Sequence, residues 1–157
     1  MKIGVIGAGR IGKVHIRNIS LFVPDLTIKT VADPFMNDKT AAYVKQFGIE
    51  NVTKDAQDIL QDPEIRVVVE TIGGTRFAYP YVKACLESGR SVCTSNKEMV
   101  ATYGAELLAL AKEHGCAFLF EASVGGGTPI ITPMHQCLAA NVITEVEGIV
   151  NGTTNFM

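Results

Sequence analysis

The sequence predicts an α/β fold with a doubly wound parallel sheet in a single domain. Short β-type runs alternate with helical patterns along the chain, as is typical of a parallel sheet covered by helices on both faces. One run contains three consecutive valines, residues 67–69, which suits a strand buried on both sides. A Gly-x-Gly-x-x-Gly sequence at residues 7–12 separates the first strand-like run from the first helical pattern.

Composition and charge narrow the function classes. The length of 157 residues suits one domain. The content of hydrophobic residues, 47%, and of charged residues, 19%, is ordinary for a globular protein. The net charge is -2 and both signs are scattered, so no nucleic-acid partner is expected. No apolar run approaches the roughly 20 residues of a membrane span, and the N-terminus lacks the zones of a signal peptide. We therefore expect a cytoplasmic protein without membrane partners.

The first half of the chain is expected to form three strands and three helices. The strands are expected at residues 2–6, 26–32 and 67–71. The helices are expected from the turn at 7–12 to about residue 19, at 37–47 and at 55–60. Structure-breaking residues end these elements: Asp33-Pro34, Gly48, Asp62-Pro63 and Gly73-Gly74.

The second half continues the alternation. Strands are expected at residues 91–94, 117–121 and 143–150, with a polar turn at 151–155. Helices are expected at residues 79–88, 96–114 and 129–140, the second of them broken near Gly104. Pro80 and Pro129 suit first helical turns, whereas Gly89 and Gly115 suit helix ends.

The cysteines and histidines give no signal of a metal site. Their spacings match no Cys or Cys/His metal motif, so reduced core thiols and unpartnered histidines are expected. The residues are Cys85, Cys93, Cys116, Cys137, His15, His114 and His135.

The glycine sequence predicts a dinucleotide-binding loop of the Rossmann type. Gly7 allows the tight turn, Gly9 lets the backbone approach a pyrophosphate, and Gly12 lets helix and strand pack closely. Backbone N–H groups and the helix dipole, with Arg10 and Ile11 in the loop, would receive the phosphates. The alternative is a turn in which glycines merely cluster.

Asp33 is the expected ribose-binding acid, because it ends the second strand 21 residues after Gly12. A carboxylate there accepts hydrogen bonds from the adenine-ribose hydroxyls and repels the 2′-phosphate of NADP. NAD is therefore the expected cofactor. NADP stays open because Arg10 is a candidate phosphate ligand, and Asp33 has the alternative role of starting the turn before Pro34.

From residue 67 onward the chain resembles homoserine dehydrogenases, over more than half of its length. Four motifs carry the resemblance: Glu-Thr-Ile-Gly-Gly at 70–74, Thr-Ser-Asn-Lys at 94–97, Glu-Ala-Ser-Val-Gly-Gly-Gly-Thr-Pro at 121–129, and Gly-Ile-Val-Asn-Gly-Thr-Thr-Asn at 148–155. Residues 1–66 also resemble the glucose–fructose oxidoreductase and inositol dehydrogenase family, through residues 7–15 and Val-Ala-Asp-Pro at 31–34. Asn-Lys-Glu at 96–98 favours homoserine dehydrogenase, because the sugar dehydrogenases have Glu-Lys-Pro there.

The resemblance implies hydride transfer from L-homoserine, an amino-acid alcohol, to a nicotinamide, which gives L-aspartate 4-semialdehyde. It implies that Lys97 acts in catalysis. It also implies that residues at two neighbouring strand ends bind the cofactor, namely Ile72, Gly73, Gly74, Thr94 and Asn96. The alternatives are a simple turn at the glycines and a solvated lysine at a helix start.

A sodium site is also implied by the resemblance. Its ligands would be the carboxylate of Glu121 and the carbonyls of Val124, Gly126 and Thr128. Hard oxygen donors suit such a cation. The alternative is a glycine loop that leads into the helix opened by Pro129.

The domain assignment follows from the same resemblance. Residues 1–142 are expected to be the dinucleotide-binding domain, and residues 143–157 the start of a substrate and dimerisation domain. The chain alone is therefore expected to bind cofactor without turnover, and a homo-oligomer is possible in the family. The competing hypotheses are a stand-alone or engineered dinucleotide-binding module and a sugar or polyol dehydrogenase fragment.

Overall fold

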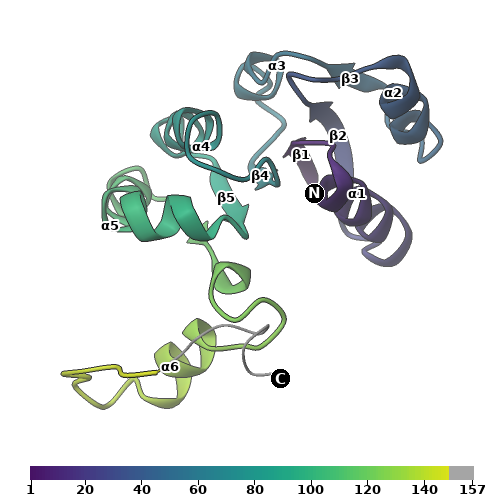
Figure 1. Cartoon of the computed structure of the whole chain (residues 1–157). Helices are drawn as coiled ribbons and strands as arrows, with labels where there is room; N and C mark the ends of the chain where they lie inside the picture. Colours follow the sequence, from purple (N-terminus) through teal and green to yellow (C-terminus); the bar gives the residue numbers. More distant parts are fainter. Residues whose placement is uncertain (149–157) are drawn as a thin grey trace.

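The computed structural model describes residues 1–148, and its centre is a six-stranded parallel sheet (Figure 1). The strand order β3-β2-β1-β4-β5-β6 is that of a doubly wound Rossmann sheet, which confirms the predicted fold class. The strands are β1 (Lys2–Ile6), β2 (Thr27–Ala32), β3 (Asn51–Thr53), β4 (Val67–Glu70), β5 (Ser91–Thr94) and β6 (Phe118–Leu119). The sequence reading missed β3, because three residues are too few to show an alternating pattern.

The helices cover both faces of the sheet. They are α1 (Arg10–Phe22), α2 (Asp38–Lys45), α3 (Gln57–Leu60), α4 (Ala78–Glu87) and α5 (Lys97–Glu113). A 3₁₀ turn, η1 (Glu121–Ser123), and a sixth helix, α6 (Ile131–Cys137), follow β6. The break expected near Gly104 is wrong, since α5 is continuous. One glycine costs a helix about 1 kcal/mol, and the burial of Met99, Leu107 and Ala111 on α5 outweighs it.

Two apolar clusters lie on opposite faces of the sheet. Ile3 and Val5 of β1 belong to one cluster, and Ile6 of the same strand belongs to the other, as alternation along a strand requires. Gly4 faces α3, and a Cβ there would lie 2.8 Å from Cγ2 of Ile59. The close approach of α3 to the sheet therefore needs a glycine at this position.

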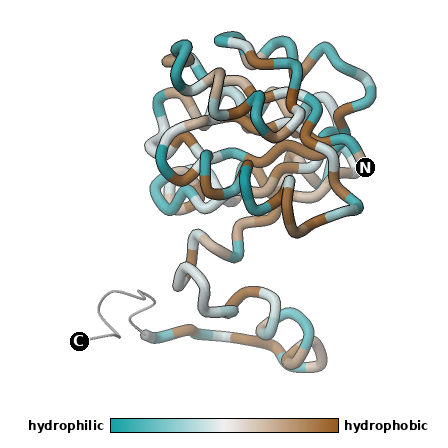
Figure 2. Tube along the Cα trace, turned by 90° about the vertical axis from the view of Figure 1, so that its right-hand side faces the viewer, coloured by the Kyte–Doolittle hydropathy of each residue, from teal (hydrophilic) through white to brown (hydrophobic). Residues whose placement is uncertain are grey.

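The C-terminal segment lies apart from the sheet and its helices in both views (Figures 1 and 2). Helix α6 contains no buried residue, and residues 135–148 are all exposed. The strand expected at 143–150 is wrong for residues 143–148, which have no strand partner within the described part of the chain. Residues 149–150 and the turn expected at 151–155 lie outside the described residues. Helix α6 also begins two residues after Pro129 and ends before residue 140.

The thiol prediction is wrong for two of the four cysteines. Cys85 is buried and Cys116 half-buried, but Cys93 and Cys137 are exposed. Burial raises the pKa of the Cys85 thiol to about 12, so this thiol is unreactive at neutral pH. Within residues 1–148 no three His, Cys, Asp or Glu side chains gather as a metal site, and no helix is long and apolar enough to cross a membrane.

Candidate cofactor site

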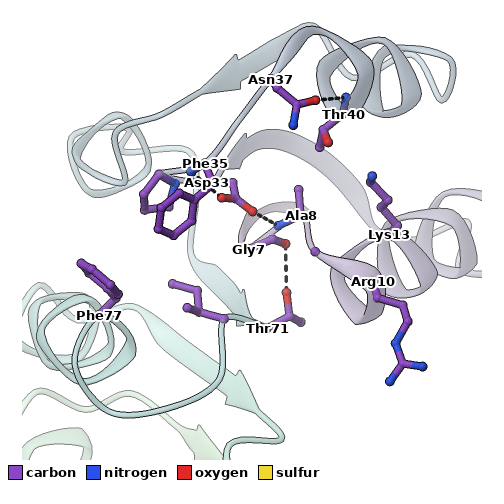
Figure 3. Close-up of a pocket in the computed structure, with 13 residues that line it drawn as sticks. Gly7, Ala8, Arg10, Lys13, Asp33, Phe35, Asn37, Thr40, Thr71 and Phe77 are labelled. Carbon is purple, nitrogen blue, oxygen red and sulfur yellow. Dashed lines mark hydrogen bonds between the residues drawn. The ribbon is translucent and has the colours of Figure 1, made fainter.

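A cavity of about 360 Å³ opens at the carboxyl ends of β1, β2 and β4 (Figure 3). Strand β1 lies between β2 and β4, so the chain reverses its direction of winding here. Doubly wound sheets bind ligands at this switch point. The cavity is lined by the glycine loop and by side chains from three further segments: Gly7, Ala8, Gly9, Arg10, Lys13, Asp33, Pro34, Phe35, Asn37, Thr40, Thr71, Ile72 and Phe77.

The three glycines of the loop differ in what surrounds them. Gly7 has φ +105°, and a Cβ there would lie 2.9 Å from the carbonyl carbon of Thr71. A Cβ on Gly12 would overlap the carbonyl oxygen of Gly7, so both residues are required by the fold. A Cβ on Gly9 would meet no described atom within 4 Å. Gly9 thus borders open space, as a residue beneath a bound pyrophosphate should.

Thr71 fastens the loop to the end of β4. Its Oγ1 donates a hydrogen bond to the carbonyl oxygen of Gly7 at 2.9 Å, and its backbone N–H donates to Ile6 at the same distance. The sequence reading missed this role. The sequence indicates this role only by placing a hydroxyl residue directly after an apolar strand, and the strand must also end beside the glycine loop.

Asp33 is half-buried at the end of β2 and lines the cavity. Its Oδ2 accepts a hydrogen bond from the backbone N–H of Ala8 at 2.6 Å, and its Oδ1 accepts one from Phe35 at 2.8 Å. The carboxylate therefore shapes the turn, which is one role considered from sequence, and it also lines the cavity in which the other role, ribose binding, would take place. The exposed Arg10 side chain extends away from Asp33 (Figure 3).

Two phenylalanines that the sequence reading missed line the cavity, and their rings contact each other edge to face. Phe35 follows the end of β2 and Phe77 precedes α4, and their ring centroids are 6.3 Å apart at an interplanar angle of 89°. Phe35 is 75% exposed, which is unusual for a residue of this size. An apolar ring exposed at a cavity mouth offers a surface on which a flat heterocycle can lie.

A smaller hollow of about 180 Å³ lies beside this cavity, at the ends of β4 and β5. It brings together residues that the sequence reading assigned to the cofactor, namely Ile11, Ile72, Gly73 and Asn96. Gly73 and Gly74 have positive φ angles of 80° and 69°, which explains two glycines in this turn. Thr94 is buried, whereas Lys97 is exposed as the first residue of α5.

The Glu121 carboxylate, the expected sodium ligand, is hydrogen-bonded within the chain. Its Oε1 accepts hydrogen bonds from the backbone N–H groups of Ile130 and Ile131, and its Oε2 accepts from the N–H and the hydroxyl of Thr132. These four donors take up the lone-pair directions of a carboxylate. They lower its pKa to about 2, with the Thr132 hydroxyl as the largest cause. Glu121 thus caps α6, and a sodium ion on Glu121, Val124, Gly126 and Thr128 stays a prediction without support from these contacts.

Comparison with known proteins places this site in a family. The family model described as "Homoserine dehydrogenase, NAD binding domain" matches residues 4–121, and the model "Homoserine dehydrogenase" matches residues 129–157. Homoserine dehydrogenase of Bacillus subtilis is 38% identical over 165 residues, which cover 100% of this chain and 37% of the relative. This chain therefore spans about a third of that relative's length.

Solved structures agree with the sequence comparison. A homoserine dehydrogenase from Thiobacillus denitrificans matches with a TM-score of 0.76 and 33% identity, over 90% of this chain and 34% of that one. A hyperthermophilic archaeal homoserine dehydrogenase in complex with NADPH matches with a TM-score of 0.66 and 28% identity, over 85% of this chain and 47% of that one. The scyllo-inositol dehydrogenase of Lactobacillus casei, at 21% identity and a TM-score of 0.59, shares the fold alone. The chain belongs to the homoserine dehydrogenase family and forms its NAD(P)-binding region.

Proposed function

We propose that this chain binds NAD in the cavity at the switch point and supplies the cofactor-binding part of a homoserine dehydrogenase. The enzyme would oxidise L-homoserine to L-aspartate 4-semialdehyde. The observation that carries the proposal is the convergence of the glycine loop, Asp33 and Thr71 on one cavity. Bound NAD supplies the hydride acceptor, and the residues of this chain supply its binding and orientation.

Each part of the cofactor is assigned to a different group of lining residues. The pyrophosphate is assigned to Gly9 and the N-terminus of α1, where no side chain caps the helix. The adenine ribose is assigned to Asp33, and the adenine to the space beside Phe35 and Phe77. The nicotinamide end is assigned to the smaller hollow, beside Ile72, Gly73 and Asn96.

The preference for NAD over NADP rests on charge. The Asp33 carboxylate would face the 2′-position of the ribose, where the phosphate of NADP adds about two negative charges. The archaeal relative was solved with NADPH, so the family includes a member that binds the phosphorylated cofactor. Arg10 and Lys13 are the cationic residues that line the cavity, and the Arg10 side chain extends away from Asp33 (Figure 3).

Lys97 is the proposed substrate-contacting residue. It follows the buried Asn96 at the start of α5, so its backbone is fixed while its side chain is exposed. A positive charge at a helix N-terminus opposes the helix dipole. An ammonium placed there against that penalty suits a role toward an anionic group of a ligand, such as the substrate carboxylate.

Two measurements test this proposal. Isothermal titration of the chain should give binding of NAD⁺ and weaker binding of NADP⁺; failure to bind either cofactor would overturn it. An assay of NADH formation with L-homoserine should give negligible turnover by this chain alone, because Lys97 cannot orient an alcohol by itself, and orientation supplies roughly 7–11 kcal/mol of a barrier. Turnover of homoserine that disappears in Lys97→Ala would show that this chain suffices, whereas turnover of inositol would favour a polyol dehydrogenase.

A further inference from the structure

Three polar side chains are buried at the carboxyl ends of β4 and β5, beneath the smaller hollow. Glu70 is 1% exposed, Thr94 2% and Asn96 7%. Strand register places Glu70 directly beside Thr94. None of the proposed binding contacts uses Glu70, although it is an acid in the interior of the protein.

Glu70 joins two turns that follow neighbouring strands. Its Oε1 accepts hydrogen bonds from the backbone N–H groups of Ile72 at 2.6 Å and Gly73 at 3.3 Å. Its Oε2 accepts one from the hydroxyl of Thr94 at 2.6 Å. The Thr94 Oγ1 in turn accepts the backbone N–H of Asn96 at 3.0 Å.

Asn96 closes the ring of hydrogen bonds. Its Nδ2 donates to the carbonyl oxygen of Gly74 at 2.6 Å, and its Oδ1 accepts the N–H of Met99 in the first turn of α5. The turn of Ile72, Gly73 and Gly74 is therefore held at its N-terminal side by Glu70 and at its C-terminal side by Asn96. The same ring fixes the start of α5, which carries Lys97.

A structural role alone does not explain an acid here. Burying a carboxylate is costly even when it is hydrogen-bonded, and an apolar side chain would usually stabilise such a position as well or better. No cation pairs with Glu70 among the described residues. What the carboxylate adds is a fixed orientation of two N–H groups and one hydroxyl.

We propose that Glu70, acting through Thr94 and Asn96, is a positioning residue that sets the geometry of the nicotinamide end of the cofactor site. This inference rests on the proposed function. The ring makes no hydrogen bond to the glycine loop or to Asp33, so the adenosine and pyrophosphate end is independent of it. Thr71, the residue after Glu70, is connected to the other end of the cofactor site, because its hydroxyl donates a hydrogen bond to Gly7 of the glycine loop.

The test compares two ligands that share the adenosine and pyrophosphate but differ in the nicotinamide. Thr94→Val removes the hydroxyl that links Glu70 to Asn96, and Glu70→Leu removes the carboxylate. In both variants we expect the affinity for NADH to fall about tenfold, in line with the loss of a hydrogen bond to a charged group. The affinity for ADP-ribose, which lacks the nicotinamide, should change by less than about twofold. Thr94→Ser, which keeps the hydroxyl, should restore NADH binding.

Thr71→Val is the matched control, and it should weaken NADH and ADP-ribose together because it releases the glycine loop. Parallel losses of both ligands in Thr94→Val, or unchanged NADH affinity in a folded variant, would overturn the inference. If Glu70→Leu does not fold, Thr94→Val and its serine counterpart decide the question. A wild-type chain that binds neither ligand would instead overturn the proposed function itself.

Discussion

The Asp33 carboxylate accepts the backbone N–H of Ala8 at 2.6 Å, so the acid at the end of β2 is hydrogen-bonded to the glycine loop that follows β1. One side chain thus connects the proposed ribose position with the proposed phosphate position. Cofactor selectivity and loop geometry are coupled at this residue, and the two contributions can be separated by choice of substitution.

Asp33→Asn should change selectivity more than loop geometry. An asparagine oxygen can still accept the N–H of Ala8 or of Phe35, but the negative charge is lost. We expect the preference for NAD⁺ over NADP⁺ to narrow by on the order of tenfold, because a like-charge repulsion is removed at a half-buried site. Asp33→Ala should narrow the same gap and also weaken both cofactors, since neither N–H keeps its acceptor. Titration calorimetry with both cofactors measures this, and an unchanged ratio in Asp33→Asn would assign selectivity to another residue.

Substitutions of Gly9, the N-cap of α1, and of Gly12, in its first turn, should have opposite effects on cofactor binding and on stability. Gly9→Val should fold with a melting temperature near that of the wild type, because a Cβ there meets no described atom within 4 Å. It should lose cofactor binding, because the added methyl groups occupy the pyrophosphate space.

Gly12→Ala should instead lose stability, by about 1–3 kcal/mol, because its Cβ would overlap the carbonyl of Gly7 and the backbone would have to move. Thermal unfolding and NADH titration of both variants separate the two effects. A folded Gly9→Val chain with unchanged NADH affinity would refute the loop assignment.

The parts of the site that sequence predicts are those with local signals. A strand, a glycine turn, a helix and an acid at the next strand end follow one another within residues 2–33, and each has its own physical requirement for residue type. The hydrogen bonds between Glu70 and Thr94, and between Thr71 and Gly7, join residues 24 and 64 positions apart. They depend on which strands are neighbours and in what register, and no local pattern encodes that.

The errors in the second half of the chain have a related cause. The β-branched residues Ile143, Thr144 and Val146 favour a strand, but a strand forms only beside a partner, and this segment has none among the described residues. Gly104 suggested a helix break because the low helix propensity of glycine does not take into account the packing of α5 on the sheet. Pro129 suggested a helix start, but α6 begins where the Glu121 carboxylate meets the N–H groups of Ile130, Ile131 and Thr132.

The cap on α6 should depend on pH in a window set by Glu121. The pKa of this carboxyl is lowered to about 2, first by the Thr132 hydroxyl and then by the backbone N–H of Ile130. A group with a depressed pKa in the folded state stabilises that state fully above its ordinary pKa, near 4.5. The stabilisation declines as the pH falls from there and is lost as the pH passes through about 2.

We therefore expect the Glu121 carboxyl to titrate by NMR with a midpoint near 2, while protection of the Ile130, Ile131 and Thr132 amides from hydrogen exchange weakens as the pH falls from about 4.5 toward 2. Glu121→Gln should lower the protection of these amides at neutral pH, because an amide group offers one acceptor oxygen instead of two. Its remaining protection should no longer vary across this acidic window. The Glu106 carboxyl is a suitable internal control, because its pKa is also lowered, by a hydrogen bond from Lys83, and neither side chain takes part in the cap. A Glu121 midpoint at or above the ordinary value would mean that the carboxylate is not held by these donors in solution, and that it is free to bind the sodium ion predicted from sequence.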